Sequence, residues 1–183
     1  MSIGSFVSTS LDLWNEGKYD ISLALACSAI DGTSAKCFPD EKYNNVRYKS
    51  FLKRNMRVIT TFGMPGISAG GIRIKCKNIP EIKTDDKQMV GIEDIIYHVI
   101  RCGLIHQCEI EDRIEFTTQT MLGDFDSMFR IPSAIIMGLV MAVVLTKENK
   151  KERLPKDHKF VFFGKRVNLN ELWGNESFAA EII

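Results

Sequence analysis

Hydrophobic residues recur at helical spacing in several stretches of the chain. Apolar positions every three or four residues predict helices over 19–30, 43–62 and 85–107, and a weaker helix over 10–16. Residues 134–145 form an unbroken apolar run of twelve, shorter than the roughly twenty residues that a membrane span needs. We therefore expect this run to be a helix buried in the core.

The stretches between these helices carry the signals of loops and short strands. Residues 63–74 hold four glycines and a proline, which predicts a loop. A phosphate cradle is a weak interpretation of this loop, because no Gly-Lys-Ser or Gly-Lys-Thr follows it, and a spacer is preferred. Residues 113–131 predict a hairpin that turns at Gly123-Asp124, and 159–173 predict a second hairpin around Gly164-Lys165.

These elements predict a mainly α fold class, a four-helix bundle-like core with one or two small β-hairpins. The length of 183 residues suits a single domain. We expect residues 1–183 to form one helical domain in which residues 147–183 are a basic linker and a small β appendage. Residues 146–159 are the hydrated part of that linker, and His158 within it is expected to be solvated.

The composition gives the chain almost no net charge. The net charge is +1, with 45% hydrophobic and 26% charged residues, so no overall field attracts nucleic acid or a membrane. The charge is unevenly distributed, however. Residues 41–60 hold six basic residues against one acidic residue, residues 147–166 hold eight against three, and residues 81–115 are net acidic. The two basic segments predict either an anion-binding face or ordinary solvated surface.

Three cations in the first basic segment share one side of the predicted helix over 43–62. Lys49, Lys53 and Arg57 recur every four residues, so they lie along one stripe. We expect this stripe to contribute to nucleic-acid binding.

Cysteine usage favours a reducing compartment. The five cysteines are odd in number and irregularly spaced, and no C-x-x-C occurs. Buried, reduced thiols of a cytoplasmic protein are therefore expected, with no structural zinc site. The first ten residues lack the basic and apolar regions of a secretion signal. We expect no membrane association and neither a metal nor another cofactor.

Candidate chemistry is concentrated in residues 95–107, "IIYHVIRCGLIHQ". At 100° per residue, Asp94, His98 and Arg101 lie within about 60° of one another and predict a hydrogen-bonded row. Arg101 and His106 are five residues apart, about 140° around an ideal helix. Their convergence therefore requires a distorted helix or a second chain.

Arginine and histidine suit an attack on RNA. Arg101 offers a planar, permanently charged fork for a phosphate, and His106 can transfer a proton to or from the 2′-hydroxyl or the leaving oxygen. The alternative is that Arg101 and His106 cap carbonyls or meet the acidic residues of 109–115. Tyr97, four residues before Arg101, either joins the site or contributes to packing.

Zinc binding is a weaker alternative. His98 with Cys102, and His106 with Cys108, provide ligand types that zinc accepts. Their spacing follows no common zinc pattern, and the helix face that carries them is apolar.

"ALACSAIDG", a Cys-Pro turn and a later helix with "IIYHVIRCGLIHQ" resemble the HEPN superfamily of helical prokaryotic proteins. Its mark is an arginine followed after four to six residues by a histidine, and Arg101-Cys-Gly-Leu-Ile-His106 matches at the shortest spacing. The resemblance covers mainly residues 19–62 and 85–145. It implies a metal-independent endoribonuclease that acts as a homodimer, with Arg101 and His106 catalytic, in a toxin–antitoxin or phage-defence setting with an antitoxin partner.

The chain departs from that pattern at one position. Active members often have a polar residue such as Asn after the arginine, where this chain has Cys102, whose thiol is a weak hydrogen-bonding group. Many members are non-catalytic. The sequence therefore predicts an endoribonuclease, and as the alternative an inactive helical module that binds RNA, a nucleotide or a protein; an inert structural or virion-associated subunit is a third interpretation.

Overall fold

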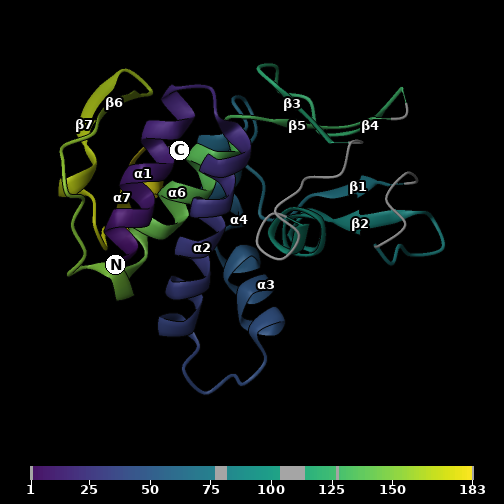
Figure 1. Ribbon diagram of the computed structural model, residues 1–183, viewed down its shortest axis with the longest axis horizontal. Helices are drawn as coiled ribbons and strands as arrows, with labels where there is room; N and C mark the ends of the chain where they lie inside the picture. Colours follow the sequence, from purple (N-terminus) through teal and green to yellow (C-terminus); the bar gives the residue numbers. More distant parts are fainter. Residues whose placement is uncertain (1, 77–81, 104–113, 127, 183) are drawn as a thin grey trace.

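Helices make up the centre of the molecule (Figure 1). The computed structural model describes residues 2–76, 82–103, 114–126 and 128–182. The α-helices in these ranges are α1 (Ile3–Asn15), α2 (Tyr19–Cys37), α3 (Asn44–Arg54), α4 (Met56–Gly63), α5 (Ile92–Ile95), α6 (Ile135–Leu145) and α7 (Ser177–Ile182). A π-helical turn, η1 (Ile96–Arg101), continues α5, and two 3-10 turns, η3 (Lys147–Asn149) and η4 (Leu169–Glu171), follow α6.

The described strands form three small sheets. They are β1 (Arg73–Lys75), β2 (Met89–Gly91), β3 (Ile114–Thr117), β4 (Gly123–Phe125), β5 (Met128–Pro132), β6 (Lys159–Phe162) and β7 (Lys165–Asn168). The pairs β1–β2 and β6–β7 are antiparallel, and in the order β3-β5-β4 the β3–β5 pairing is parallel. Figure 1 shows β6 and β7 on one side of the helices and the other two sheets on the opposite side.

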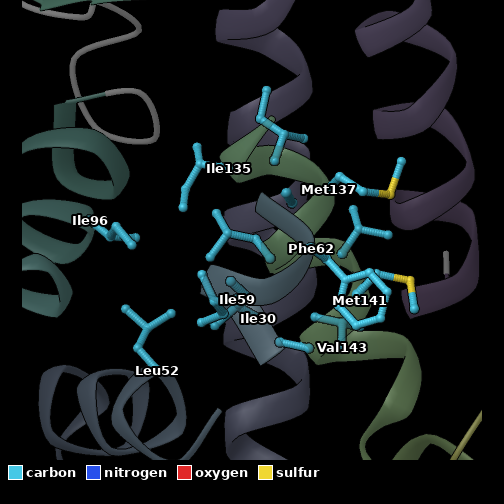
Figure 2. Close-up of a cluster of buried hydrophobic side chains, with 14 of the residues drawn as sticks. Ile30, Leu52, Ile59, Phe62, Ile96, Ile135, Met137, Met141 and Val143 are labelled. Carbon is cyan, nitrogen blue, oxygen red and sulfur yellow. The ribbon is translucent and has the colours of Figure 1, made fainter. Parts of the chain in front are cut away.

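Helix α6 is the centre of the core. All eleven of its residues are buried and all are apolar or glycine, as expected for a helix surrounded by protein. Figure 2 shows Met141 and Val143 of α6 close to Ile59 and Phe62 of α4 and Ile30 of α2. None of the helices in the described ranges is both long and apolar enough to cross a membrane.

Glycines let α4 and α6 pack with their backbones close together. A Cβ added at Gly138 would lie 3.1 Å from the Gly63 Cα and 3.0 Å from the Ile59 carbonyl carbon. A Cβ added at Gly63 would lie 2.9 Å from the Ile135 Cα. Larger residues at either glycine would therefore force the two helices apart.

Serines hold α1 against α2. The Ser10 hydroxyl donates to the Ser22 carbonyl at 2.8 Å, and the Ser22 hydroxyl donates to the Ser10 carbonyl at 2.7 Å. Both serines are buried. These reciprocal hydrogen bonds satisfy the buried hydroxyl groups and join α1 to α2, while Val7 and Leu11 of α1 are buried in the core.

The expected mainly α, four-helix bundle-like core is wrong. The structure combines its helices with three small sheets, and α1 belongs to the core although only a weaker helix was predicted at 10–16. The predicted helix over 43–62 is broken at Asn55, whose side-chain amide donates to the Phe51 carbonyl at 3.0 Å.

The helix predicted over 85–107 begins further along the chain than predicted. Met89–Gly91 pairs with β1 as strand β2, so helical structure begins only at Ile92. Asp85 accepts the backbone N–H groups of Lys87 and Met89 in the turn before β2. Strand pairing therefore overrides the helical periodicity in this segment.

The second predicted hairpin is confirmed, and the first is only partly right. β6 and β7 pair across a two-residue turn in which Phe163 and Gly164 have φ of 50° and 80°, a left-handed conformation that glycine adopts easily. The other pairing, β4–β5, turns after Phe125 instead of at Gly123-Asp124, and β3 adds in parallel.

We expect Gly138→Ala to lower the free energy of unfolding by about 1–3 kcal/mol, because the new methyl group overpacks the α4–α6 contact. Gly70→Ala is the matched control, since a Cβ there meets nothing within 4 Å. Urea unfolding measures both. Equal stabilities of the two variants would contradict the close-contact interpretation.

Candidate functional site

Arg101 lies at the end of the π-helical turn η1 and is held by an ion pair. Its Nε and Nη2 both donate to Oδ2 of Asp31, in α2, at 3.1 and 3.0 Å. The two side chains are 11% and 23% exposed, so the pair is mostly shielded from solvent. Burial opposes the charge of Arg101, but the Asp31 carboxylate outweighs it and raises the pKa of Arg101.

Aromatic and thiol groups surround this pair. The Arg101 guanidinium lies 5.6 Å from the centre of the Tyr97 ring, and Tyr97 meets the ring of Tyr48 edge-on at 5.3 Å. The Cys102 thiol contributes a hydrogen bond that favours the charged form of Arg101. Buried beneath them, the Cys27 thiol lies against the Tyr48 hydroxyl, and burial raises the pKa of Cys27 to about 12. Cys27 is therefore an inert core thiol.

The helix that leads into Arg101 is distorted into a π-helical turn. A π-helix bonds residue i to residue i+5 instead of i+4. The described π-helical residues are Ile96–Arg101, and His106 and Cys108 lie outside the described residues. Such turns are rare and are frequent at functional sites, which makes η1 a meaningful distortion.

Each residue of the predicted row, Asp94, His98 and Arg101, contacts a different partner. Asp94 accepts from Lys49 of α3 at 3.1 Å, whereas the exposed His98 ring packs edge-on against Tyr97 at 5.0 Å. Partial burial, followed by the nearby Lys49 charge, lowers the pKa of His98. Arg101 faces Asp31, so the three side chains contact three different elements.

The predicted basic stripe is partly neutralised. Lys49 pairs with Asp94, and Lys53 pairs with Glu93 at 3.5 Å. Arg57 is exposed and has no ion-pair partner in the part of the chain that the structure describes. The stripe is thus a row of ion pairs between α3 and α5 that ends in one available cation.

Metal-ligating side chains do not gather in the described ranges. No group of three or more His, Cys, Asp or Glu suitable for a metal ion occurs among those residues.

A match to a protein family extends over almost the whole chain. A family model described as Rv1289 matches residues 2–183. The chain belongs to the Rv1289 family. Its relatives include the uncharacterized protein Rv1289 of Mycobacterium tuberculosis strain H37Rv and the uncharacterized protein Mb1320 of Mycobacterium bovis. Each is 23% identical over 194 residues, which cover 100% of this chain and 88% of the relative.

No solved structure matches the chain. Both relatives are uncharacterized proteins, so the family gives no function to Arg101 or His106. The resemblance to the HEPN superfamily stays a prediction.

A histidine that was expected to be solvated is buried. His158 Nε2 lies 3.0 Å from the Ser8 hydroxyl of α1, and Asp12 approaches the same nitrogen at 3.9 Å. A catalytic triad places its carboxylate on the other ring nitrogen, so this is not a triad. Asn149 and Leu154 in the same predicted linker are buried as well, so the expected hydration of 146–159 holds for most of its residues but not for these.

We expect Asp31 and Arg101 to be coupled by about 1–3 kcal/mol, because removing one partner leaves a poorly solvated charge. A double-mutant cycle with Asp31→Asn and Arg101→Gln, followed by urea unfolding, measures this coupling. The control is the exposed pair Glu16 and Lys18, with 54% and 57% exposure, which should couple by less than about 1 kcal/mol. Equal coupling in both cycles would show that the Arg101 pair is not shielded.

We expect stability to fall as the pH decreases from about 7.5 to 5.5, and the buried His158 to be a main cause. Burial lowers the pKa of His158, although Asp12 opposes this, whereas the unfolded chain titrates near 6.5. The unfolded state therefore binds more protons below that pH, and stability is lost as pH falls. His158→Gln should lose less stability over this pH range than the wild-type protein does. His98→Gln, a substitution at an exposed position, should lose nearly as much as the wild type. An unchanged pH profile in His158→Gln would contradict this assignment.

Proposed function

We propose that the protein binds RNA and cleaves it without a metal ion, using Arg101 and His106. The 2′-oxygen attacks the adjacent phosphorus, and the bond from phosphorus to the 5′-oxygen breaks. His106 takes the 2′-hydroxyl proton or returns one to the leaving oxygen, and Arg101 stabilises the charge on the phosphate. The products are a 2′,3′-cyclic phosphate and a 5′-hydroxyl.

The π-helical turn that ends at Arg101 is the observation that carries this proposal. It shows that the helix leading into Arg101 departs from ideal α-helical geometry, and a distorted helix is one of the two conditions under which a motif of this spacing can converge. Asp31 and Tyr97 limit the motion of the guanidinium, and a fixed fork binds phosphate more effectively than a mobile one. Arg57 and Lys53, exposed on the adjacent helices, provide charge for the RNA backbone.

The proposal includes a second copy of the chain. Two Arg101–His106 motifs that face each other across a dimer would share one phosphate. An antitoxin partner would then act by covering this composite site.

A second candidate is a non-catalytic binding module. The ion pair favours it, because Asp31 already occupies one side of the Arg101 guanidinium and only 11% of that side chain is exposed. In this case Arg101 would fasten η1 to α2, and RNA or another partner would bind elsewhere on the surface.

We expect the purified protein to cut single-stranded RNA in the presence of EDTA and to leave cyclic phosphate ends. His106→Ala should slow cleavage by about 100- to 10,000-fold, because general acid–base catalysis contributes that much. Arg101→Lys keeps the charge but loses the fork, and should also lose most activity. His158→Gln, assayed at pH 7.5, is the histidine control and should remain active.

The two candidates predict different outcomes of this experiment. Loss of cleavage in His106→Ala with an unchanged unfolding midpoint supports the nuclease. Cleavage that is absent from the wild-type protein, or that survives both substitutions, rejects it. A destabilised Arg101→Lys variant with unchanged RNA binding supports the non-catalytic module.

A further inference from the structure

A hollow between α3, the glycine-rich loop and β2 is separate from the Arg101 pair. Its volume is about 470 Å³, within the usual range of small-molecule sites. The residues around it are Lys53, Met56, Gly70, Gly71, Ile72, Arg73, Gly91 and Glu93. They provide two cationic side chains, one carboxylate, two apolar side chains and the backbone of the glycines.

Both cations at this hollow are exposed. Lys53 is 63% exposed and lies 3.5 Å from Glu93, and Arg73 is 60% exposed and pairs with Asp85 at 2.7 Å. Exposed ion pairs contribute little, so either cation can turn toward an anionic ligand at small cost.

The glycine-rich loop presents bare backbone to the hollow. Neither Gly70 nor Gly71 donates its N–H to a residue in the described ranges, and a Cβ at either position would meet nothing within 4 Å. The loop is nevertheless anchored to α4, because the Thr60 hydroxyl donates to the Ala69 carbonyl at 3.1 Å and accepts its N–H at 2.9 Å. The available N–H groups are therefore held in place next to two cations.

Glu93 lines the hollow next to Lys53. Its side chain lies against Gly91, where an added Cβ would come within 2.6 Å of the Glu93 carboxyl carbon. The side chain is only 13% exposed. This carboxylate would repel a bare anion, but it can accept hydrogen bonds from hydroxyl or amino groups.

We propose that this hollow binds a nucleoside phosphate. The phosphate would bind Lys53, Arg73 and the N–H groups of Gly70 and Gly71, and Glu93 would accept the ribose hydroxyls. Met56 and Ile72 provide an apolar surface for the base. The nucleoside phosphate is either a free mononucleotide or the phosphorylated end of an RNA chain. This inference goes beyond the proposed cleavage and does not require Arg101 or His106.

Calorimetric titration of the full chain tests the proposal, with adenosine monophosphate, adenosine and inorganic phosphate as probes. We expect saturable binding of the monophosphate that is stronger than that of either fragment. Lys53→Ala and Arg73→Ala should each weaken it about tenfold or more, since each removes a charge-assisted hydrogen bond. Lys75→Ala is the matched control, because it removes a cation two residues along the same strand that does not line the hollow. Equal effects of Lys75→Ala and Arg73→Ala would overturn the proposal, as would absence of binding at millimolar monophosphate.

Glu93→Gln separates a nucleoside site from a general anion site. Loss of the negative charge should strengthen phosphate binding, whereas replacing the charged carboxylate by a weaker amide acceptor should reduce the preference for the monophosphate over phosphate. A preference that stays unchanged would contradict the role of Glu93. Titration with a short RNA carrying a 5′-phosphate or a 5′-hydroxyl identifies the source: tighter binding of the phosphorylated RNA than of the mononucleotide assigns the site to RNA ends, and the reverse order assigns it to free nucleotides.

Discussion

The close contact of α4 with α6 at Gly63 and Gly138 is the constraint on which the rest of the structure depends. It lets the fully apolar α6 lie directly on α4, so that one helix supplies the middle of the core. The position of α4 in turn sets the glycine-rich loop, since Thr60 of α4 binds both backbone groups of Ala69. The hollow at Gly70 and Gly71 is therefore a consequence of how the core packs.

The two candidate sites use charge in opposite ways. At Arg101 the positive charge is matched by Asp31, mostly buried and fixed by an aromatic ring, which suits a group that must keep its orientation. At the hollow, Lys53 and Arg73 are exposed and can change partners. The ion pair of Lys49 with Asp94 connects the two regions, because it joins α3 to α5, the helix that continues into η1.

Part of this structure follows from local sequence patterns. The apolar run over 134–145 and the turn at Phe163-Gly164 carry strong signals, and both elements are present. The strand at Met89–Gly91 could not be predicted because its pairing partner, β1, lies more than ten residues earlier, and the helical periodicity of 85–107 hides it. The π-helical turn likewise has no established sequence signal. Burial of His158 depends on a contact with Ser8 of α1, at the other end of the chain.

From the sequence alone, only the types of residue at the candidate site could be predicted, and not their partners. Spacing placed Arg101 and its neighbours on one helix. Asp31, the ion-pair partner of Arg101, lies seventy positions earlier, directly after the helix predicted over 19–30, and nothing in the sequence linked the two. The glycine-rich loop was first interpreted as a spacer, because no phosphate-loop motif follows it. The cations next to the loop come from α3 and β1, and only the folded chain brings them together.

Helix α1 is bonded both to its neighbour in sequence and to a much later segment, and this has a consequence for folding. The hydrogen bonds between Ser10 and Ser22 join α1 to α2. The Gly4 backbone donates to Glu152 at 3.1 Å, and Ser8 binds His158, so α1 cannot complete its packing until about residue 158 is available. During synthesis α1 can therefore pack on α2 early, whereas its remaining contacts form only after the later segment has left the ribosome.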